Sequence, residues 1–374
     1  MTTINAANER IKRDYFRYLR EALGRDEATI DGVAKSLARF EEATTARDFK
    51  RFHREQAVAF KARLAAAVNL RTGEWLSKAT VLATMRDLRA FFMWLAREPG
   101  FRKHIAYADA DYFNLPDKDV AVARARRESR VPTLDQVRRV IATMPAGTVL
   151  ERRNRALIAF AMLTGARIAA LASFRLGHVD MVEGFVEQDA RSVRTKAAKT
   201  FRTYFMPVDM DALAIVAEWV DELGRDHLWG PDDPLFPATE MGLAPDGSFA
   251  PVGLSRRGWA SSEPVRDIYR LAFRAADLPY FTPHSFRAML VRHAMTLDLS
   301  PVAMKAWSQN LGHADVLTTF TSYGSVPVHR QGELVRSIGG KSTGAGKINA
   351  EQVAALEAML AAMKADAAPQ GEAP

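Results

Sequence analysis

Residues 281–324 contain two short sequences, FTPHSFRAMLVRHAM at the start and LGHADVLTTFTSYG at the end. The first carries His284 and Arg287 as His-x-x-Arg, and the second carries His313 in Leu-Gly-His, with Tyr323 ten residues later. Arginine binds a phosphate through paired hydrogen bonds at any working pH, and histidine exchanges a proton near neutrality. Tyrosine becomes a covalent nucleophile when its phenolate is stabilised. Because no carboxylate cluster accompanies these residues, the stretch does not indicate a metal-assisted reaction.

The composition of the chain limits its partners and its compartment. Its 374 residues suffice for two domains, and 52 Lys and Arg against 44 Asp and Glu give a net charge of +8. This basic balance favours a polyanionic partner. The absence of cysteine excludes disulfides and thiolate metal sites. Because no signal peptide or bilayer-spanning apolar run is recognisable, we expect a cytoplasmic, nucleoid-associated bacterial protein without membrane contact.

Residues 1–115 are predicted to form a helical domain. Apolar residues recur at helical spacing in four segments up to residue 98, and residues 81–95 show the clearest stripe, followed by a Pro-Gly pair. The aromatic residues near the end of this last helix are interpreted as core rather than as a platform for stacking bases. They are Phe91, Phe92 and Trp94.

Residues 116–131 are predicted to be a basic linker, because the hydrophobic periodicity is lost from residue 109 onward. The segment contains Arg124, Arg126, Arg127 and Arg130. We expect these arginines to lie along a nucleic-acid backbone. An ordinary solvated linker is the alternative interpretation.

A second domain is predicted for residues 132–338. Thr133 and Gln136 form a capping-box pattern, and residues 151–163 read as a buried helix that ends at a Thr-Gly pair before Arg167. Residues 178–208 carry the only strong β signal, which indicates three short strands with turns at residues 183–184 and 197–198. Further helices are expected at 209–223, 263–276, 285–296 and 301–311, with a loop region at 228–254.

Residues 339–374 are predicted to be a flexible Gly- and Ser-containing linker, an amphipathic helix and a disordered tail. The helix covers residues 349–364, where apolar residues recur at helical spacing. A helix on a flexible linker either folds back onto its own domain or docks on a neighbouring subunit. We favour the neighbour because the linker permits the reach.

These residues together make the chain similar to the tyrosine recombinases of the phage integrase family. Each motif is weak alone, and each residue has an ordinary structural reading, such as an arginine paired with a surface carboxylate. The order and spacing of the whole set are specific. The resemblance implies a mainly α fold with a small antiparallel β-sheet (α+β), comprising a helical core-binding domain and a catalytic domain. It implies these catalytic residues: Arg167, Lys196, His284, Arg287, His313 and Tyr323.

The resemblance also implies a reaction. Tyr323 would attack a DNA phosphodiester, form a 3′-phosphotyrosine and release a 5′-hydroxyl, with no metal, ATP or other cofactor. Arg167 and Arg287 would stabilise the charge on the phosphate. A hairpin lysine, Lys196 or the competing Lys199, would protonate the departing oxygen.

The remaining implied roles concern the histidines and the partners. His284 would assist proton transfer with the tyrosine, and His313 would hydrogen-bond the phosphate. The expected partners are a double-stranded DNA target site, a homotetramer on two sites joined through the C-terminal helix, and accessory DNA-bending factors.

One position departs from the family pattern. Members usually carry an acidic residue three positions after the first arginine, where this chain has Ala170. That residue supports the active-site arginines and is not itself a catalytic group, so an active enzyme is still expected, with a slower or conditional enzyme as the alternative. Two alternatives remain: a catalytically weakened DNA-binding relative, and a type IB topoisomerase-like enzyme that nicks and closes one duplex.

Overall fold

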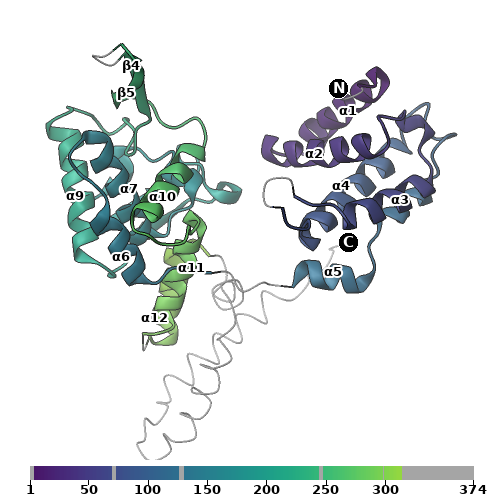
Figure 1. The fold of residues 1–374 in the computed structure, drawn as a ribbon. Coiled ribbons are helices and arrows are strands. Elements are labelled where there is room, and N and C mark those ends of the chain that lie inside the picture. The colour runs from purple at the N-terminus through teal and green to yellow at the C-terminus, as the bar shows by residue number, and fades with distance from the viewer. Residues whose placement is uncertain (1–3, 70–72, 126–129, 244–246, 298, 314–374) are drawn as a thin grey trace, which may run out of the picture. The chain divides into compact units, whose positions relative to one another are not determined.

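A computed structural model describes residues 4–69, 73–125, 130–243, 247–297 and 299–313 (Figure 1). Contacts divide the chain into two compact units, with the boundary between Arg127 and Glu128. The described part is mainly helical and contains small antiparallel sheets, as the sequence predicted. Within it, no helix is both long enough and apolar enough to cross a membrane.

The first unit consists of helices whose starts are set by polar caps. The side chains of Asn5, Asp26 and Ser77 accept hydrogen bonds from the first turns of three of them. The elements are α1 (Ala6–Arg17), η1 (Tyr18–Ala22), α2 (Glu27–Ala43), η2 (Phe49–Arg51), α3 (Arg54–Ala65), α4 (Lys78–Leu95), η3 (Tyr107–Phe113) and α5 (Asp117–Arg124).

An aromatic core holds the first unit together. Phe91 and Phe92 of α4 are fully buried, which confirms their interpretation as core residues. The ring of Phe52 stacks on that of Phe92 with a centroid separation of 3.8 Å, and Trp94 lies against the same core. These rings are therefore packed against one another and are not available for stacking on bases.

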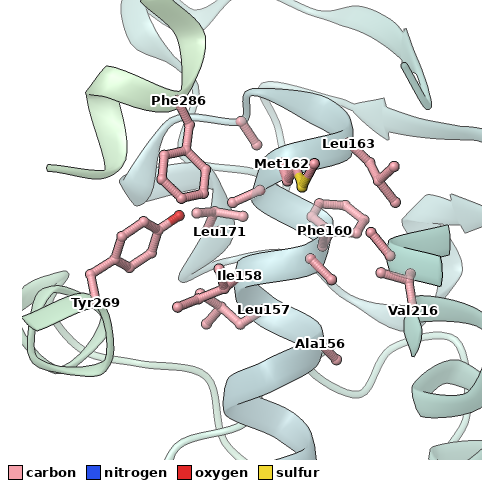
Figure 2. Close-up of a cluster of buried hydrophobic side chains, with 14 of the residues drawn as sticks. Ala156, Leu157, Ile158, Phe160, Met162, Leu163, Leu171, Val216, Tyr269 and Phe286 are labelled. Carbon is pink, nitrogen blue, oxygen red and sulfur yellow. The ribbon is translucent and has the colours of Figure 1, made fainter. Parts of the chain in front are cut away.

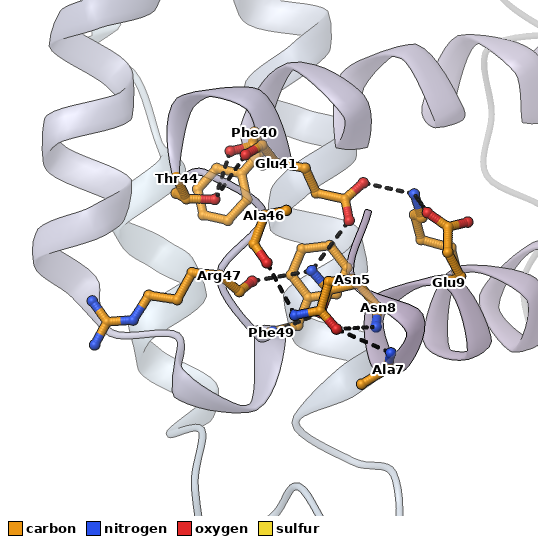
Figure 3. A network of polar contacts seen from close by, with 11 residues as sticks. Asn5, Ala7, Asn8, Glu9, Phe40, Glu41, Thr44, Ala46, Arg47 and Phe49 are labelled. Atoms are coloured by element: carbon orange, nitrogen blue, oxygen red, sulfur yellow. Dashed lines mark hydrogen bonds and ion pairs between the residues drawn. The ribbon is translucent and has the colours of Figure 1, made fainter. Parts of the chain in front are cut away.

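A buried amide joins α1 to the chain after α2 (Figure 3). The Asn8 side chain donates to the Arg47 carbonyl at 3.0 Å and to Glu41 at 3.1 Å, and it accepts from the Phe49 amide at 3.0 Å. Buried polar groups are costly unless bonded, so this satisfied network specifies how α1 packs.

The second unit is built around one buried helix. Its elements are α6 (Leu134–Thr143), α7 (Val149–Thr164), α8 (Ile168–Leu171), η4 (Leu176–His178), β1 (Val179–Asp180), β2 (Phe185–Gln188), η5 (Lys196–Ala198), β3 (Phe201–Tyr204), α9 (Met210–Arg225), β4 (Thr239–Leu243), β5 (Phe249–Leu254), α10 (Glu263–Ala275), α11 (Pro283–Ala294) and α12 (Pro301–Asn310). Residues 156–163 of α7 are all buried, so this helix is apolar on every side. Val216, Tyr269 and Phe286 from three other helices pack into the same core (Figure 2).

The predicted local signals of this unit are confirmed. Thr133 and Gln136 exchange both hydrogen bonds of a capping box. The strands β1, β2 and β3 form an antiparallel sheet in that order, with turns where the sequence placed them. The hairpin between β2 and β3 carries Lys196 and Lys199, which are both exposed.

Two local predictions are wrong. Residues 228–254 were expected to be loop, but β4 and β5 form an antiparallel hairpin there. Residues 5–98 were expected to be wholly helical, but Val68 and Trp75 form an isolated antiparallel bridge between α3 and α4. In both cases backbone pairing decides the structure where local periodicity is weak. Within the segment 116–131, interpreted as a linker, residues 117–124 form α5.

Candidate active site

Arg167 lies at the junction of α7 and α8. Gly165 ends α7 in the left-handed conformation, with φ of 56°, and Arg167 precedes the first turn of α8. A Cβ atom on Gly165 would lie 2.9 Å from the Leu311 side chain and 3.0 Å from that of Leu290. The glycine is therefore needed both for the turn and for the close approach of α11 and of the chain after α12.

Arg287 lies in the buried interior of the site, on α11, and is only 1% exposed. Its Nη1 donates to the Gly165 carbonyl at 2.8 Å, and its Nη2 donates to the Leu311 carbonyl. Nη2 also lies 3.0 Å from Nε2 of His313. One guanidinium thus joins the end of α7, the helix α11 and the turn after α12, which places the His-x-x-Arg and Leu-Gly-His motifs side by side.

His313 follows Gly312, whose φ of 68° turns the chain back after α12. The imidazole is 7% exposed. Because a guanidinium only donates hydrogen bonds, Nε2 of His313 must be the acceptor toward Arg287. The proton of the neutral ring therefore sits on Nδ1, which leaves that atom as the ring's donor.

Both site histidines are held in the neutral form. Burial lowers the pKa of His313 to about 4, and the charges of Arg287 and Arg167 add to the effect. Desolvation by surrounding protein atoms also lowers the pKa of His284, followed by the charges of Arg287, Arg167 and Lys196. No carboxylate of the described residues is among the causes of either shift. The site therefore has an excess of positive charge and suits an anion such as a phosphate.

The low pKa of His313 predicts a pH-dependent stability. In the unfolded chain the ring takes up a proton near pH 6.5, whereas in the folded protein it does so only near 4. The unfolded state thus binds more protons between these values. The contribution of His313 to the free energy of unfolding is therefore complete above about pH 6.5. It is lost as the pH falls toward about 4, and the loss amounts to about 3 kcal/mol.

Urea unfolding of the wild type and of His313→Gln, at about pH 7.5 and about pH 4.5, measures this contribution. Glutamine keeps an acceptor for Arg287 but does not titrate. We expect the wild type to lose more stability than the variant between the two pH values. Equal losses in both proteins would contradict the assignment of a neutral, buried His313.

The β2–β3 hairpin brings basic side chains to the same histidines. The charge of Lys196 acts on His284, and the charge of Lys199 acts on His313. A hollow of about 730 Å³, with Lys199, Arg202 and His313 in its wall, lies between β3 and α12. Both lysines are thus near the site, and the choice between them as general acid stays a prediction.

Ala170 is fully buried on α8 and belongs to the apolar core of the second unit. The position where the family usually carries an acidic side chain is therefore filled by a methyl group packed among apolar side chains. The carbonyl oxygens of Gly165 and Leu311 hold the Arg287 guanidinium in this chain. Backbone acceptors thus position at least this arginine.

Several predicted residues cannot be placed in the site. Tyr323, Arg126, Arg127 and the helix expected at residues 349–364 lie outside the described residues. Arg124 ends α5 and Arg130 precedes α6, and both are exposed. Their expected contact with a nucleic-acid backbone stays a prediction.

Two other kinds of chemistry find no support in the described part. It contains no group of three or more His, Cys, Asp or Glu side chains that could hold a metal ion. His178 and Ser192 lie 2.9 Å apart, which suggests a nucleophile and its base. However, Nδ1 of His178 already accepts from the Arg175 amide, so its Nε2 donates to Ser192 and cannot take the serine proton.

Sequence reasoning missed Asn310, the residue before Leu-Gly-His. Its side chain makes two hydrogen bonds to the backbone of Tyr204 in β3. In the sequence, Asn310 is visible only as an amide residue near the end of a predicted helix, before an apolar residue and a glycine. That signal does not reveal a partner more than a hundred residues away.

Comparisons with known proteins agree with this architecture. A family model described as the phage integrase family matches residues 130–328. Tyrosine recombinase XerC of Xylella fastidiosa (strain 9a5c) is 25% identical over 310 residues, covering 83% of this chain and 90% of the relative. Tyrosine recombinase XerD of Oceanobacillus iheyensis is 22% identical over 314 residues, covering 82% and 90%.

Solved structures show the same fold. A lambda integrase (75–356) dimer bound to a COC′ core site superposes with a TM-score of 0.57 at 14% identity, covering 86% of this chain and 99% of the integrase. The XerH site-specific recombinase bound to its difH substrate gives a TM-score of 0.54 at 14% identity, covering 89% and 85%. At these identities the likeness concerns the fold alone.

Proposed function

Since the chain belongs to the phage integrase family of tyrosine recombinases, we propose that it is a site-specific DNA recombinase. It cleaves and rejoins DNA strands through a covalent 3′-phosphotyrosine. Neither a metal ion nor ATP is needed, because the phosphotyrosine bond retains the energy of the phosphodiester that was broken.

The observation that carries this proposal is the environment of Arg287. Its buried guanidinium is fixed by two carbonyl oxygens and lies beside His313, while Arg167 and both hairpin lysines act on the two site histidines. Phosphoryl transfer is catalysed mainly by positioning and by stabilising charge on the phosphate oxygens. A preorganised group of cations that includes a buried, doubly bonded guanidinium suits that task.

The proposed step is a displacement at phosphorus. The phenolate oxygen of Tyr323 forms a bond to phosphorus while the bond to the 5′ oxygen breaks. Arg167 and Arg287 stabilise the charge that develops on the non-bridging oxygens. Lys196 gives its proton to the departing 5′ oxygen, with Lys199 as the competing donor.

The histidines complete the proposed site. His284 assists the transfer of the tyrosine proton, and it is suited to accept one because its lowered pKa keeps it neutral. His313, whose Nε2 accepts from Arg287, hydrogen-bonds the phosphate.

The proposed substrate is a double-stranded DNA site bound by both units. A lambda integrase with the same fold has been solved as a tetramer bound to a Holliday junction, with a TM-score of 0.53. By analogy, four copies of this chain would act on two sites, with the C-terminal helix joining neighbouring subunits and accessory factors bending the DNA. The arginines proposed to follow the DNA backbone are Arg124, Arg126, Arg127 and Arg130.

Strand exchange between two copies of a cognate site on one supercoiled plasmid tests this proposal. DNA flanking the protein's own gene supplies the candidate sites, and the buffer contains a metal chelator. We expect deletion or inversion of the segment between the sites, depending on their orientation. Relaxed plasmid without exchange would instead indicate a topoisomerase-like enzyme. Site binding with neither product would indicate a weakened relative, with Ala170 as the first position to examine.

A further inference from the structure

Asn310, the last residue of α12, is bonded to strand β3 as a neighbouring strand would be. Its Oδ1 accepts from the Tyr204 amide at 2.7 Å, and its Nδ2 donates to the Tyr204 carbonyl at 2.8 Å. The strands of this sheet follow the order β1-β2-β3, so one edge of β3 pairs with β2. The amide side chain thus satisfies both backbone groups of Tyr204 on the edge of β3 that β2 does not occupy.

The backbone of Asn310 is joined to both strands of the hairpin. Its carbonyl accepts from Oγ1 of Thr203 in β3 at 2.9 Å. The same Oγ1 accepts from Nε2 of Gln188 in β2 at 2.9 Å. Both Thr203 and Gln188 are buried, so their polar groups depend on these bonds. The end of α12 therefore holds β2 as well as β3.

Gly312 brings the same segment against the start of β3. A Cβ atom on Gly312 would lie 2.5 Å from the ring of Phe201, the first residue of β3. Phe201 stands two residues after Lys199, so this contact lies next to the hairpin tip.

On its other side, the segment 310–313 is held by Arg287, through the Leu311 carbonyl and the His313 ring. These few residues therefore connect the arginine and histidine site to the hairpin that carries the lysines. Within the described residues, the side chain of Asn310 bonds Tyr204 and Met206 and its carbonyl accepts from Thr203, whereas the Leu311 carbonyl and the His313 ring contact Arg287.

We propose that Asn310 is a positioning residue that fixes the β2–β3 hairpin so that its lysine reaches the departing 5′ oxygen. This inference rests on the proposed function. In this role Asn310 acts through the hairpin and supplies no reacting group. Its loss should therefore impair protonation of the leaving group and spare stabilisation of the phosphate charge, because Arg287 keeps its backbone acceptors.

The chemistry of the leaving group separates these two contributions. When phosphorus bonds to the tyrosine and the bond to the 5′ oxygen breaks, the oxygen needs the lysine proton, since an alkoxide is a poor leaving group. When sulfur replaces that oxygen, the bond breaks to give a thiolate, which is stable without a proton near its pKa of about 8.5. A variant that lacks only the positioned acid should therefore recover on the sulfur substrate.

The experiment measures the rate of covalent adduct formation on two suicide substrates that differ only in a 5′ oxygen or a 5′ sulfur. The variants are Asn310→Ala and the isosteric Asn310→Asp, which puts an oxygen in place of the Nδ2 donor to Tyr204. Val302→Ala serves as the matched control, because Val302 is an exposed residue of the same helix that does not line the hollow beside His313. Thermal melting and DNA binding are recorded for each protein.

On the oxygen substrate we expect both Asn310 variants to be about 10- to 100-fold slower than the wild type. This slowing is smaller than that expected from removing the general acid itself, because the lysine is still present. On the sulfur substrate we expect their rates to be within about twofold of the wild-type rate. The variant that removes the general acid, Lys196→Ala or Lys199→Ala, should recover on this substrate in the same way. Val302→Ala should match the wild type on both substrates.

Two outcomes would overturn the inference. Equal slowing of the Asn310 variants on both substrates would mean that Asn310 has only a structural role, and wild-type rates on both would mean that the hairpin does not depend on it. Failure of the wild type to form an adduct on either substrate would instead remove the proposed function itself. The wild-type reaction thus distinguishes the two failures.

Discussion

Replacing Arg287 by lysine is expected to slow DNA cleavage by about 10²- to 10³-fold, although the positive charge is kept. The guanidinium makes three contacts at once, to the carbonyls of Gly165 and Leu311 and to Nε2 of His313. A lysine ammonium is a compact charge on a flexible stem and does not reproduce this planar geometry. The residual charge would therefore lie away from the position that the phosphate oxygens occupy.

The same replacement is expected to lower the free energy of unfolding by about 1–3 kcal/mol, because a buried carbonyl would lose its donor. Single-turnover cleavage at saturating protein and urea unfolding measure the two effects separately. Arg225→Lys is the matched control, since Arg225 ends α9 in exposed ion pairs with Asp221 and Asp226. Cleavage by Arg287→Lys at the wild-type rate would contradict the assignment of Arg287 to the phosphate site.

Local signals predicted much of the second unit. The apolar run in α7, the capping box at Thr133 and the glycine break at Gly165 each depend on a few consecutive residues, and the structure confirms them. The strands β2 and β3 were also predicted, because they lie in the segment of the sequence that carries the strong β signal.

Structures that depend on distant partners were missed. The strands β4 and β5 carry Pro251, Gly242 and Gly253, residues that are depleted in strands, so their sequence resembles a loop. The pairing between them, and not local propensity, produces the hairpin. The bonds from Asn310 to β3 likewise join positions 106 residues apart, which no periodicity indicates.

The candidate site likewise contains features that the sequence predicted and features that it did not reveal. Spacing and residue type singled out Arg167, His284, Arg287 and His313, and the structure places the last two in contact while the charge of Arg167 acts on both histidines. The sequence did not reveal that backbone carbonyls hold Arg287 in a chain that has Ala170 instead of an acidic residue. Backbone acceptors are present at every residue, so their use depends on how the chain folds.

Replacing Tyr323 by phenylalanine is expected to abolish covalent attachment to DNA while leaving DNA binding unchanged within about twofold, because only the nucleophilic oxygen is removed. Phenylalanine keeps the aromatic ring and lacks only the hydroxyl group. A phenol has an ordinary pKa of about 10, so the reaction depends on the surrounding cations to favour the phenolate. Tyr204→Phe is the matched control, since Tyr204 is an exposed tyrosine of the second unit whose bonds to Asn310 use only its backbone.

The measurement that tests the central claim most directly is trapping on a nicked suicide substrate in the presence of a metal chelator. After denaturation, the adduct is digested and the modified peptide is identified by mass spectrometry. The account predicts a denaturation-resistant adduct with the wild type and Tyr204→Phe, with the DNA attached through its 3′ phosphate to Tyr323, and none with Tyr323→Phe. An adduct that persists in Tyr323→Phe, or specific binding of the wild-type protein to its cognate site without any adduct, would contradict it.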